Sequence, residues 1–220
     1  MHPDIEKAIV NPSQFNGSVY FNKSWALFWK SPWLFIGALF VWGMIGIVLG
    51  VIPIIGQIAS VLIYPIEFAG FYIVVKKLLS KQDIEFNDFF KGFQFGGKLI
   101  LPYVLHALIV AIGFVFLIIP GIYFAVAYMF VIPLALFYEE EPWNILEASR
   151  KIITKKWWSF FGFVVLLILF NILGLICLGI GLLVTIPVSI ITTYMIFEDF
   201  VKPDSEQSFS TDSTLLDSDI

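Results

Sequence analysis

Long apolar stretches alternate along this chain with polar connections of two different kinds. An uninterrupted apolar run of roughly 20 residues matches the thickness of a bilayer and exceeds what the core of a soluble domain requires. The hydropathy pattern therefore predicts six transmembrane helices. Their expected ranges are 33–52, 57–75, 99–119, 121–138, 158–178 and 180–197.

The connections between these helices alternate between short turns and long charged loops. Short segments rich in Gly and Pro lie at 50–57, 119–121 and 178–181, and they suit tight turns at one membrane face. The long connections, 76–98 and 139–156, carry most of the Lys and Arg residues, and all 13 basic residues of the chain fall on the opposite face. We therefore expect three hairpins, with both termini in the cytoplasm by the positive-inside rule.

An amphipathic segment precedes each predicted hairpin. Phenylalanines recur at helical spacing over 86–93 with charged or polar residues between them, and similar segments lie near 21–29 and 145–156. These patterns predict helices on the membrane surface. The expected fold is an all-α polytopic membrane bundle of six transmembrane helices with interfacial amphipathic helices. Its parts are a cytoplasmic segment (1–32), a transmembrane domain (33–199) and a disordered acidic tail (200–220).

The spacing of distinctive residues indicates an internal repeat of about 60 residues. A tryptophan follows both Ser24 and Ser149 by nine residues. A tyrosine follows both Pro65 and Pro187 by seven residues, on the second helix of the first and third hairpins. The middle hairpin matches this pattern less well. Because each unit would begin and end on the same face, the repeats would be related by rotation about the membrane normal.

Three polar residues are expected at similar depth in the membrane: Glu67, His106 and Ser189. An ionised carboxylate at this depth is costly unless it is paired or hydrated. A Glu67–His106 pair, with Ser189 beside it, would form an intramembrane polar site suited to a proton relay or a polar substrate. The alternative is a protonated Glu67 that hydrogen-bonds to a neighbouring helix.

Composition narrows the possible functions. Apolar residues make up 59% of the chain and charged residues 14%, and the chain holds two His and one Cys. Neither a metal cluster nor a nucleotide-binding or nucleophile motif is present in the sequence, so we expect a protein that is no enzyme, has no cofactor or metal and binds no nucleic acid. The N-terminus does not resemble a cleavable signal peptide. A basic run is expected to contact anionic lipid headgroups: Arg150, Lys151, Lys155 and Lys156.

The runs IPGIYFAVAYMFVIPLALFYEE, ILEASRKIITKKWW and LGIGLLVTIPVSIITTY resemble a family of bacterial six-helix integral membrane proteins of unknown function. That family is similar to the membrane domain of some glycerophosphoryl diester phosphodiesterases. The resemblance spans roughly residues 20 to 200 and implies a multi-pass protein of the bacterial inner membrane. The resemblance assigns no catalytic residue to this sequence, because no segment of the 220 residues corresponds to the soluble phosphodiesterase domain.

The function expected from the sequence is a non-enzymatic membrane scaffold, a lipid sensor or a subunit of a larger complex. Its partners would be membrane lipids, another membrane protein or a second copy of the chain. The alternative is a small transporter or channel with a polar site around Glu67 and His106. An intramembrane enzyme acting on lipid would need a water-accessible acid and base, which only the same two residues would supply.

Overall fold

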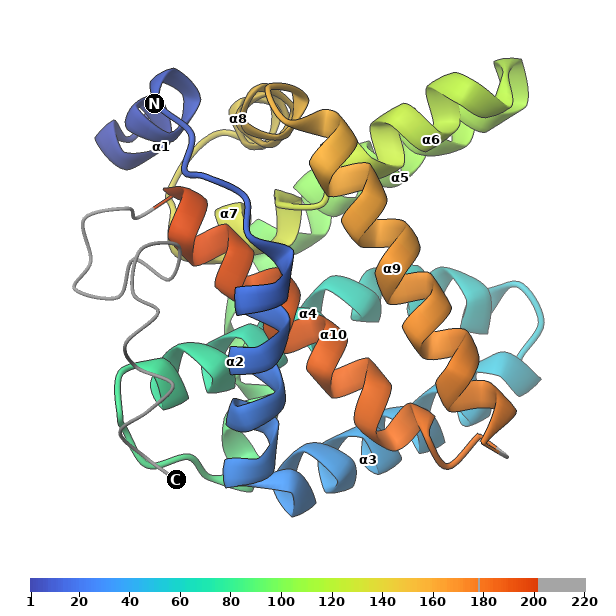
Figure 1. Cartoon of the computed structure of the whole chain (residues 1–220). Helices are drawn as coiled ribbons and strands as arrows, with labels where there is room; N and C mark the ends of the chain where they lie inside the picture. The colour runs from blue at the N-terminus through green and yellow to red at the C-terminus, as the bar shows by residue number, and fades with distance from the viewer. Residues whose placement is uncertain (178, 202–220) are drawn as a thin grey trace.

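The computed structural model describes residues 1–177 and 179–201 (Figure 1). Six segments in this part of the chain are long and apolar enough to cross a membrane, which confirms the all-α membrane bundle. They form three hairpins: α3 (Pro32–Val51) with α4 (Ile55–Leu79), α5 (Gly96–Phe116) with α6 (Ile118–Ala127) and α7 (Val131–Phe137), and α9 (Trp157–Ile176) with α10 (Leu182–Val201).

Four shorter elements lie away from the hairpin turns: α1 (Pro3–Val10), α2 (Gly17–Lys30), the 3-10 helix η1 (Phe86–Phe95) and α8 (Pro142–Thr154). Every Lys and Arg among the described residues lies on these elements, in their connections or at the adjoining ends of the long helices. We call this side of the molecule the basic end and the side of the three turns the tip end.

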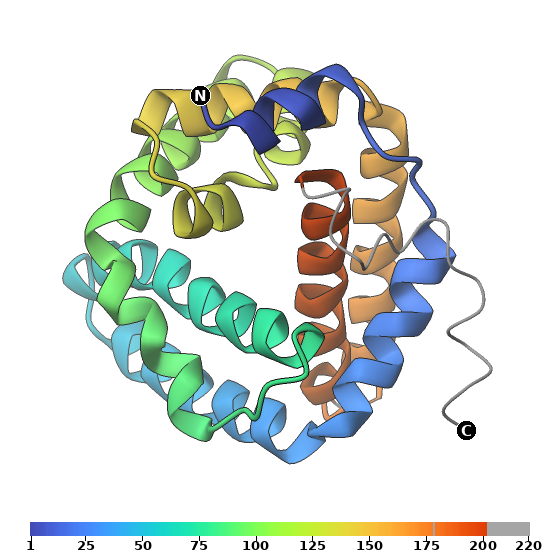
Figure 2. The same cartoon turned by 90° about the vertical axis from the view of Figure 1, so that its left-hand side faces the viewer.

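The two helices of each hairpin occupy different places. The outgoing helices α3, α5 and α9 run from the basic end to the tip end, and 17% of the apolar window of each is buried. The returning helices α4, α6–α7 and α10 have 44%, 50% and 61% of their windows buried. Figure 2 shows α4, α7 and α10 inside a ring formed by the other helices. The protein core is therefore built from the returning helices.

Each of the three amphipathic elements packs on the returning helix of the preceding hairpin. η1 contacts α4, α8 contacts α6 and α7, and α2 contacts α10, which closes the ring. The same rule holds at all three places, as a repeat related by rotation requires. These elements are therefore part of the protein core on one side, in addition to being amphipathic.

The contact between η1 and α4 is close enough to involve backbone atoms. A side chain at Gly70 would collide with the carbonyl of Phe89, and one at Gly92 would collide with the carbonyl of Ile66. Asp88, which is 1% exposed, forms ion pairs with the ammonium groups of Lys77 and Lys91. The expected surface helix is thus a 3-10 helix held against α4.

The middle returning helix is interrupted, although the hydropathy pattern predicts one helix over 121–138. The interruption lies between α6 and α7, where the Ser149 hydroxyl donates to the Ala127 carbonyl (2.8 Å) and accepts from the Phe130 N–H (3.2 Å). Pro133 lies in the first turn of α7, where a backbone N–H has no partner within the helix. Because of this position, the proline costs α7 no hydrogen bond. A hydroxyl from α8 therefore satisfies the backbone groups that the interruption releases.

Two other boundaries differ from those predicted. The middle turn, expected at 119–121, lies at Leu117, and α6 begins at Ile118 with Pro120 in its first turn. Proline is well tolerated there because the first N–H groups of a helix have no intrahelical partner. At the other end of the chain, Phe200 and Val201 belong to α10 and are buried, whereas the rest of the predicted acidic tail, 202–220, lies outside the described residues.

Candidate functional site

A cavity of about 420 Å³ lies between the three hairpins. We call it the central cavity. Every hairpin contributes to its wall, and the contributing helices are α4, α5, α7, α9 and α10 together with the residues that separate α6 from α7. The lining residues are Tyr64, Phe68, Tyr72, Tyr103, His106, Tyr128, Met129, Ile132, Asn171, Ile186, Ser189, Ile190 and Thr193.

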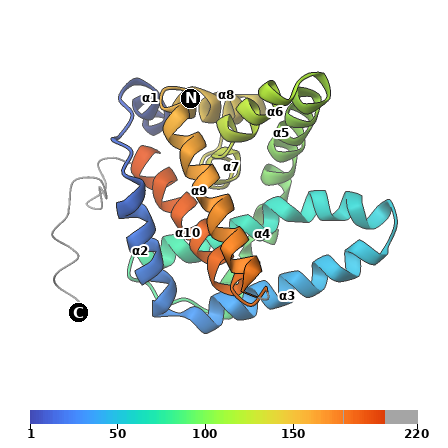
Figure 3. The same cartoon turned by 45° about the vertical axis from the view of Figure 1, so that its right-hand side comes forward.

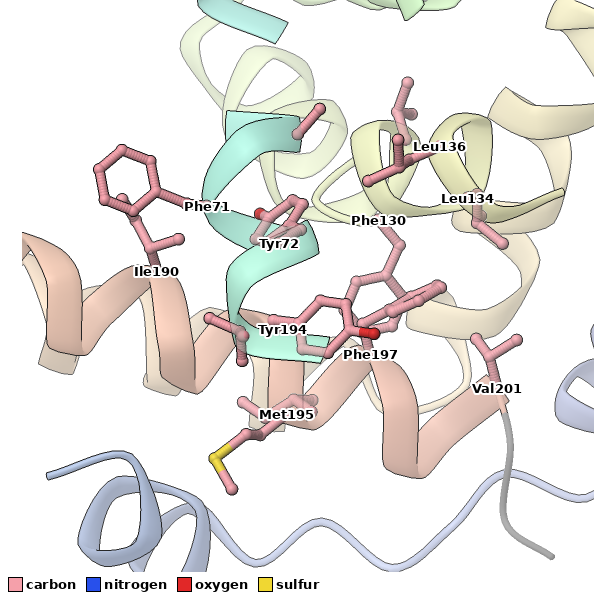
Figure 4. Close-up of a cluster of buried hydrophobic side chains, with 14 of the residues drawn as sticks. Phe71, Tyr72, Phe130, Leu134, Leu136, Ile190, Tyr194, Met195, Phe197 and Val201 are labelled. Atoms are coloured by element: carbon pink, nitrogen blue, oxygen red, sulfur yellow. The ribbon is translucent and has the colours of Figure 1, made fainter. Parts of the chain in front are cut away.

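The central cavity is closed towards the basic end by aromatic side chains. The rings of Tyr72 and Tyr194 lie 5.5 Å apart, and the Phe137 ring lies 5.7 Å from that of Tyr194. Figure 4 shows Tyr72 and Tyr194 within this buried cluster. Tyr72 is 2% exposed, whereas Tyr64, two turns nearer the tip end on the same helix, is 42% exposed. The cavity therefore opens towards the tip end.

His106 lies among aromatic rings in this cavity. Tyr103 and Tyr128 make edge contacts with the imidazole, each with a centroid separation of 5.6 Å. Tyr64 stacks on Tyr103 at 5.4 Å. The His106 Nδ1 atom is buried and has no hydrogen-bond partner among the described residues. A buried ring nitrogen without a partner is energetically costly, so a bound molecule would gain by providing one.

The opposite wall of the cavity carries a second polar group. The Asn171 amide nitrogen donates to the Ser189 hydroxyl (2.9 Å) and to the Leu167 carbonyl (2.8 Å), and the Ser189 hydroxyl donates to the Thr185 carbonyl (2.7 Å). The Asn171 side-chain oxygen is buried and has no hydrogen-bond partner among the described residues. Two lining residues on different hairpins thus each carry a buried polar atom without a hydrogen-bond partner among the described residues, within a mostly apolar and aromatic wall.

Of the three residues predicted to form a polar site, the structure brings two into the same cavity. His106 and Ser189 both line it, whereas Glu67 is half-buried and is absent from the described lining. Tyr64 and Phe68 follow one another along the cavity face of α4, and Glu67 is turned away from Phe68 by about 100°. Within the described part of the chain, Glu67 forms no ion pair or hydrogen bond. The expected Glu67–His106 pair is therefore not formed.

The predicted lipid-contacting residues fall into two groups. Arg150 donates two hydrogen bonds to the Glu147 carboxylate (2.8 and 2.9 Å), and Lys151 lies 3.4 Å from it. The hydrogen bond from Arg150 lowers the pKa of Glu147 below its usual value. Lys155 instead donates to the carbonyl of Val10 at the end of α1, and Lys156 donates to the carbonyl of Ser13 in the segment between α1 and α2. The two cations of the first group thus share one carboxylate within α8, while the second group has no carboxylate partner in the described residues.

Sequence reasoning did not identify the tyrosines that surround His106. A tyrosine combines an apolar ring with a hydroxyl that needs a partner, so tyrosines in apolar helices are a usable signal for a polar interior. Among the described residues, no three His, Cys, Asp or Glu side chains come together as metal ligands would. No protein-family model, curated protein or solved structure matches this chain.

Proposed function

We propose that this chain is a non-enzymatic multi-pass protein of the bacterial inner membrane that binds an amphipathic molecule in the central cavity. In this role it senses or organises its lipid environment, with the basic end in the cytoplasm. The observation that carries the proposal is a mostly apolar cavity with buried, unpartnered polar atoms on His106 and Asn171. Such a wall suits a molecule with an apolar body and a polar group.

The arrangement of the hairpins supports access from the membrane. Figure 3 shows α3–α4, α5–α6 and α9 diverging towards their turns, so the three turns lie apart from one another at the tip end. The aromatic closure at Tyr72 and Tyr194 separates the cavity from the basic end. A molecule dissolved in the bilayer would therefore enter laterally or from the tip end, and its polar group would find His106 or Asn171.

The separation of Glu67 from His106 favours binding over catalysis. General acid–base chemistry needs two titratable groups within reach of the same reacting atoms. His106 faces the cavity, but Glu67 is not part of its described lining. Among the described lining residues, His106 is surrounded by tyrosines and has no carboxylate beside it, which suits polar contacts to a ligand better than proton transfer.

The proposal is tested with a diazirine-bearing long-chain alcohol, a neutral amphipathic probe, photoactivated on the protein in phosphatidylcholine bilayers. We expect insertion into residues 103–128 and 186–193, and a loss of at least about tenfold in this labelling when His106→Trp fills the cavity. Glu67→Gln serves as the control and should label as the wild type does. Labelling that spares Tyr128 and residues 186–193, or that is unaffected by His106→Trp in a folded protein, would contradict the proposal.

A small transporter is the second candidate, and the unpartnered His106 nitrogen in a cavity is the observation in its favour. Transport would require the Tyr72–Tyr194 contact to separate, because it closes the path to the basic end. Proton flux into proteoliposomes that is lost in His106→Leu but kept in Glu67→Gln would favour this candidate. We expect no flux above protein-free liposomes in either variant or in the wild type.

A further inference from the structure

A second apolar hollow, of about 680 Å³, lies on the membrane-facing surface between the start of α2 and the length of α9. We call it the α2–α9 groove. Its wall includes Gly162, Leu166, Leu169 and Leu173 on α9. No atom lies within 4 Å of where a side chain at Gly162 would begin, so this glycine leaves the groove open.

A polar hollow of about 720 Å³ adjoins the groove at the basic end. Phe15 and Ser159 line both spaces, so the two lie next to each other, and together we call them the depression. The polar hollow is lined by Lys155 and Lys156 and by no acidic residue among the described ones. Polarity therefore changes along the depression, from cationic at the basic end to apolar along α9.

The apolar part of the depression has the depth of one leaflet. From Gly162 to Leu173 the helix rises by about 16 Å at 1.5 Å per residue. The hydrocarbon core of a bilayer is roughly 30 Å thick, so this length is about half of it. Trp157 and Trp158 line the polar hollow, and tryptophan prefers the headgroup level of the membrane. The depression thus runs from the headgroup level to about the midplane.

The two lysines are held in place at the edge of the hollow. Lys155 Nζ donates to the Val10 carbonyl (3.1 Å), and Lys156 Nζ donates to the Ser13 carbonyl (2.8 Å). An ammonium group has three donors, so each lysine keeps further donors for an anionic oxygen. Neither lysine has a carboxylate partner within the described residues, which leaves their charge available to a ligand.

We propose that one anionic phospholipid of the bilayer occupies this depression, with its phosphate at Lys155 and Lys156 and one acyl chain along the α2–α9 groove. The site is separate from the central cavity, because the two share no lining residue. A lipid that merely surrounds the protein would show little headgroup preference. A lipid held by two positioned ammonium groups and a groove should be retained with defined stoichiometry.

The test is native mass spectrometry of the protein released from detergent after titration with phosphatidylglycerol or phosphatidylcholine of equal chain length. We expect one phosphatidylglycerol per chain, bound at least about tenfold more tightly than phosphatidylcholine. Gly162→Leu, which fills the groove, should reduce retention of phosphatidylglycerol by about tenfold or more. Gly46→Leu is the matched control, since Gly46 is also a helical glycine with open space around it.

The charge contribution is tested with the double variant Lys155→Gln/Lys156→Gln, which should abolish the headgroup preference. Lys30→Gln/Lys81→Gln removes two exposed charges elsewhere on the basic end and should leave the preference intact. On the wild type alone, phosphatidylglycerol with six-carbon chains should bind at least about tenfold more weakly than that with sixteen-carbon chains.

Equal retention of the two lipids, unsaturable binding, or binding independent of chain length would overturn the proposal. So would unchanged binding in a folded Gly162→Leu protein. The comparison of six-carbon and sixteen-carbon phosphatidylglycerol uses the wild-type protein, so it still tests binding of the acyl chain in the groove if Gly162→Leu does not fold. His106→Trp should leave phosphatidylglycerol retention unchanged, so failure of this proposal and failure of the central-cavity proposal give different results.

Discussion

The outgoing and returning helices differ in a way opposite to what a soluble protein would show. The outgoing helices are the more hydrophobic, with mean hydropathies of 2.5, 2.4 and 2.6, yet 17% of each is buried. The returning helices have values of 1.9, 2.0 and 1.4 and form the core. Lipid is as apolar as a leucine side chain, so hydrophobicity does not drive a helix inwards in a bilayer. Close packing and polar contacts determine which helix is interior.

Glycine illustrates the same contrast. Gly70 on α4 lies where the backbone of η1 approaches it, and no side chain fits there. Gly43, Gly46 and Gly50 on α3 have open space around them and do not support packing within the chain. The same residue type therefore allows η1 to approach α4 closely at Gly70 and borders open space along α3.

The sharpest contrast is expected between two phenylalanines. Phe71→Ala on α4 removes a side chain that is 0% exposed, and it should lower the free energy of unfolding by about 4 kcal/mol, because it leaves a cavity in the core. Phe40→Ala on α3 removes one that is 65% exposed, and lipid should fill the space at a cost below about 1 kcal/mol. Unfolding in mixed detergent micelles measures both, and equal losses would contradict the assignment of core and lipid faces.

Gly70→Ala should destabilise the protein by about 3 kcal/mol, because the new methyl group collides with the Phe89 carbonyl and forces η1 away from α4. Gly46→Ala, the matched change on α3, should be neutral or stabilising by up to about 1 kcal/mol, since alanine is the better helix former. Thermal unfolding in detergent compares the two. A tolerated Gly70→Ala would show that η1 does not pack as closely on α4 as described.

Ser149→Ala should cost about 2 kcal/mol, because it leaves the Ala127 carbonyl and the Phe130 N–H buried without their hydroxyl partner. Ser60→Ala, which removes a hydroxyl bonded only to a carbonyl of its own helix, should cost less than about 0.5 kcal/mol. Hydrogen exchange of the Phe130 amide provides a local measurement. Unchanged protection in Ser149→Ala would mean that another group supports the interruption between α6 and α7.

Acidification should have the smallest effect. The pKa of Glu147 is lowered in the folded protein, so its ionised form stabilises the fold above the unfolded-state pKa and this contribution is lost as the pH falls through the folded value. The pair with Arg150 is partly exposed, so the change should stay below about 1 kcal/mol. Glu147→Gln should remove this part of the pH dependence. An identical pH profile in the variant would assign the effect to other carboxyl groups.

Hydropathy predicted the six spans because a transmembrane segment is recognised from its own residues, and each predicted span overlaps its helix along most of its length. The interruption between α6 and α7 was not predicted, because it depends on Ser149, which lies 22 residues beyond Ala127 in the sequence. Counting residues from the membrane boundary predicts similar depths for Glu67 and His106. It does not give the direction in which each side chain points, and Glu67 therefore falls outside the cavity.

The most direct test of this architecture is photolabelling of the wild-type protein in bilayers that contain a phosphatidylcholine with a diazirine on its acyl chain, followed by mapping of the labelled residues. We predict labelling along α3, α5 and α9, and several-fold weaker labelling around Phe71 on α4 and Tyr194 on α10, which are buried. Equal labelling of outgoing and returning helices would contradict the central claim that the less hydrophobic helix of each hairpin forms the interior.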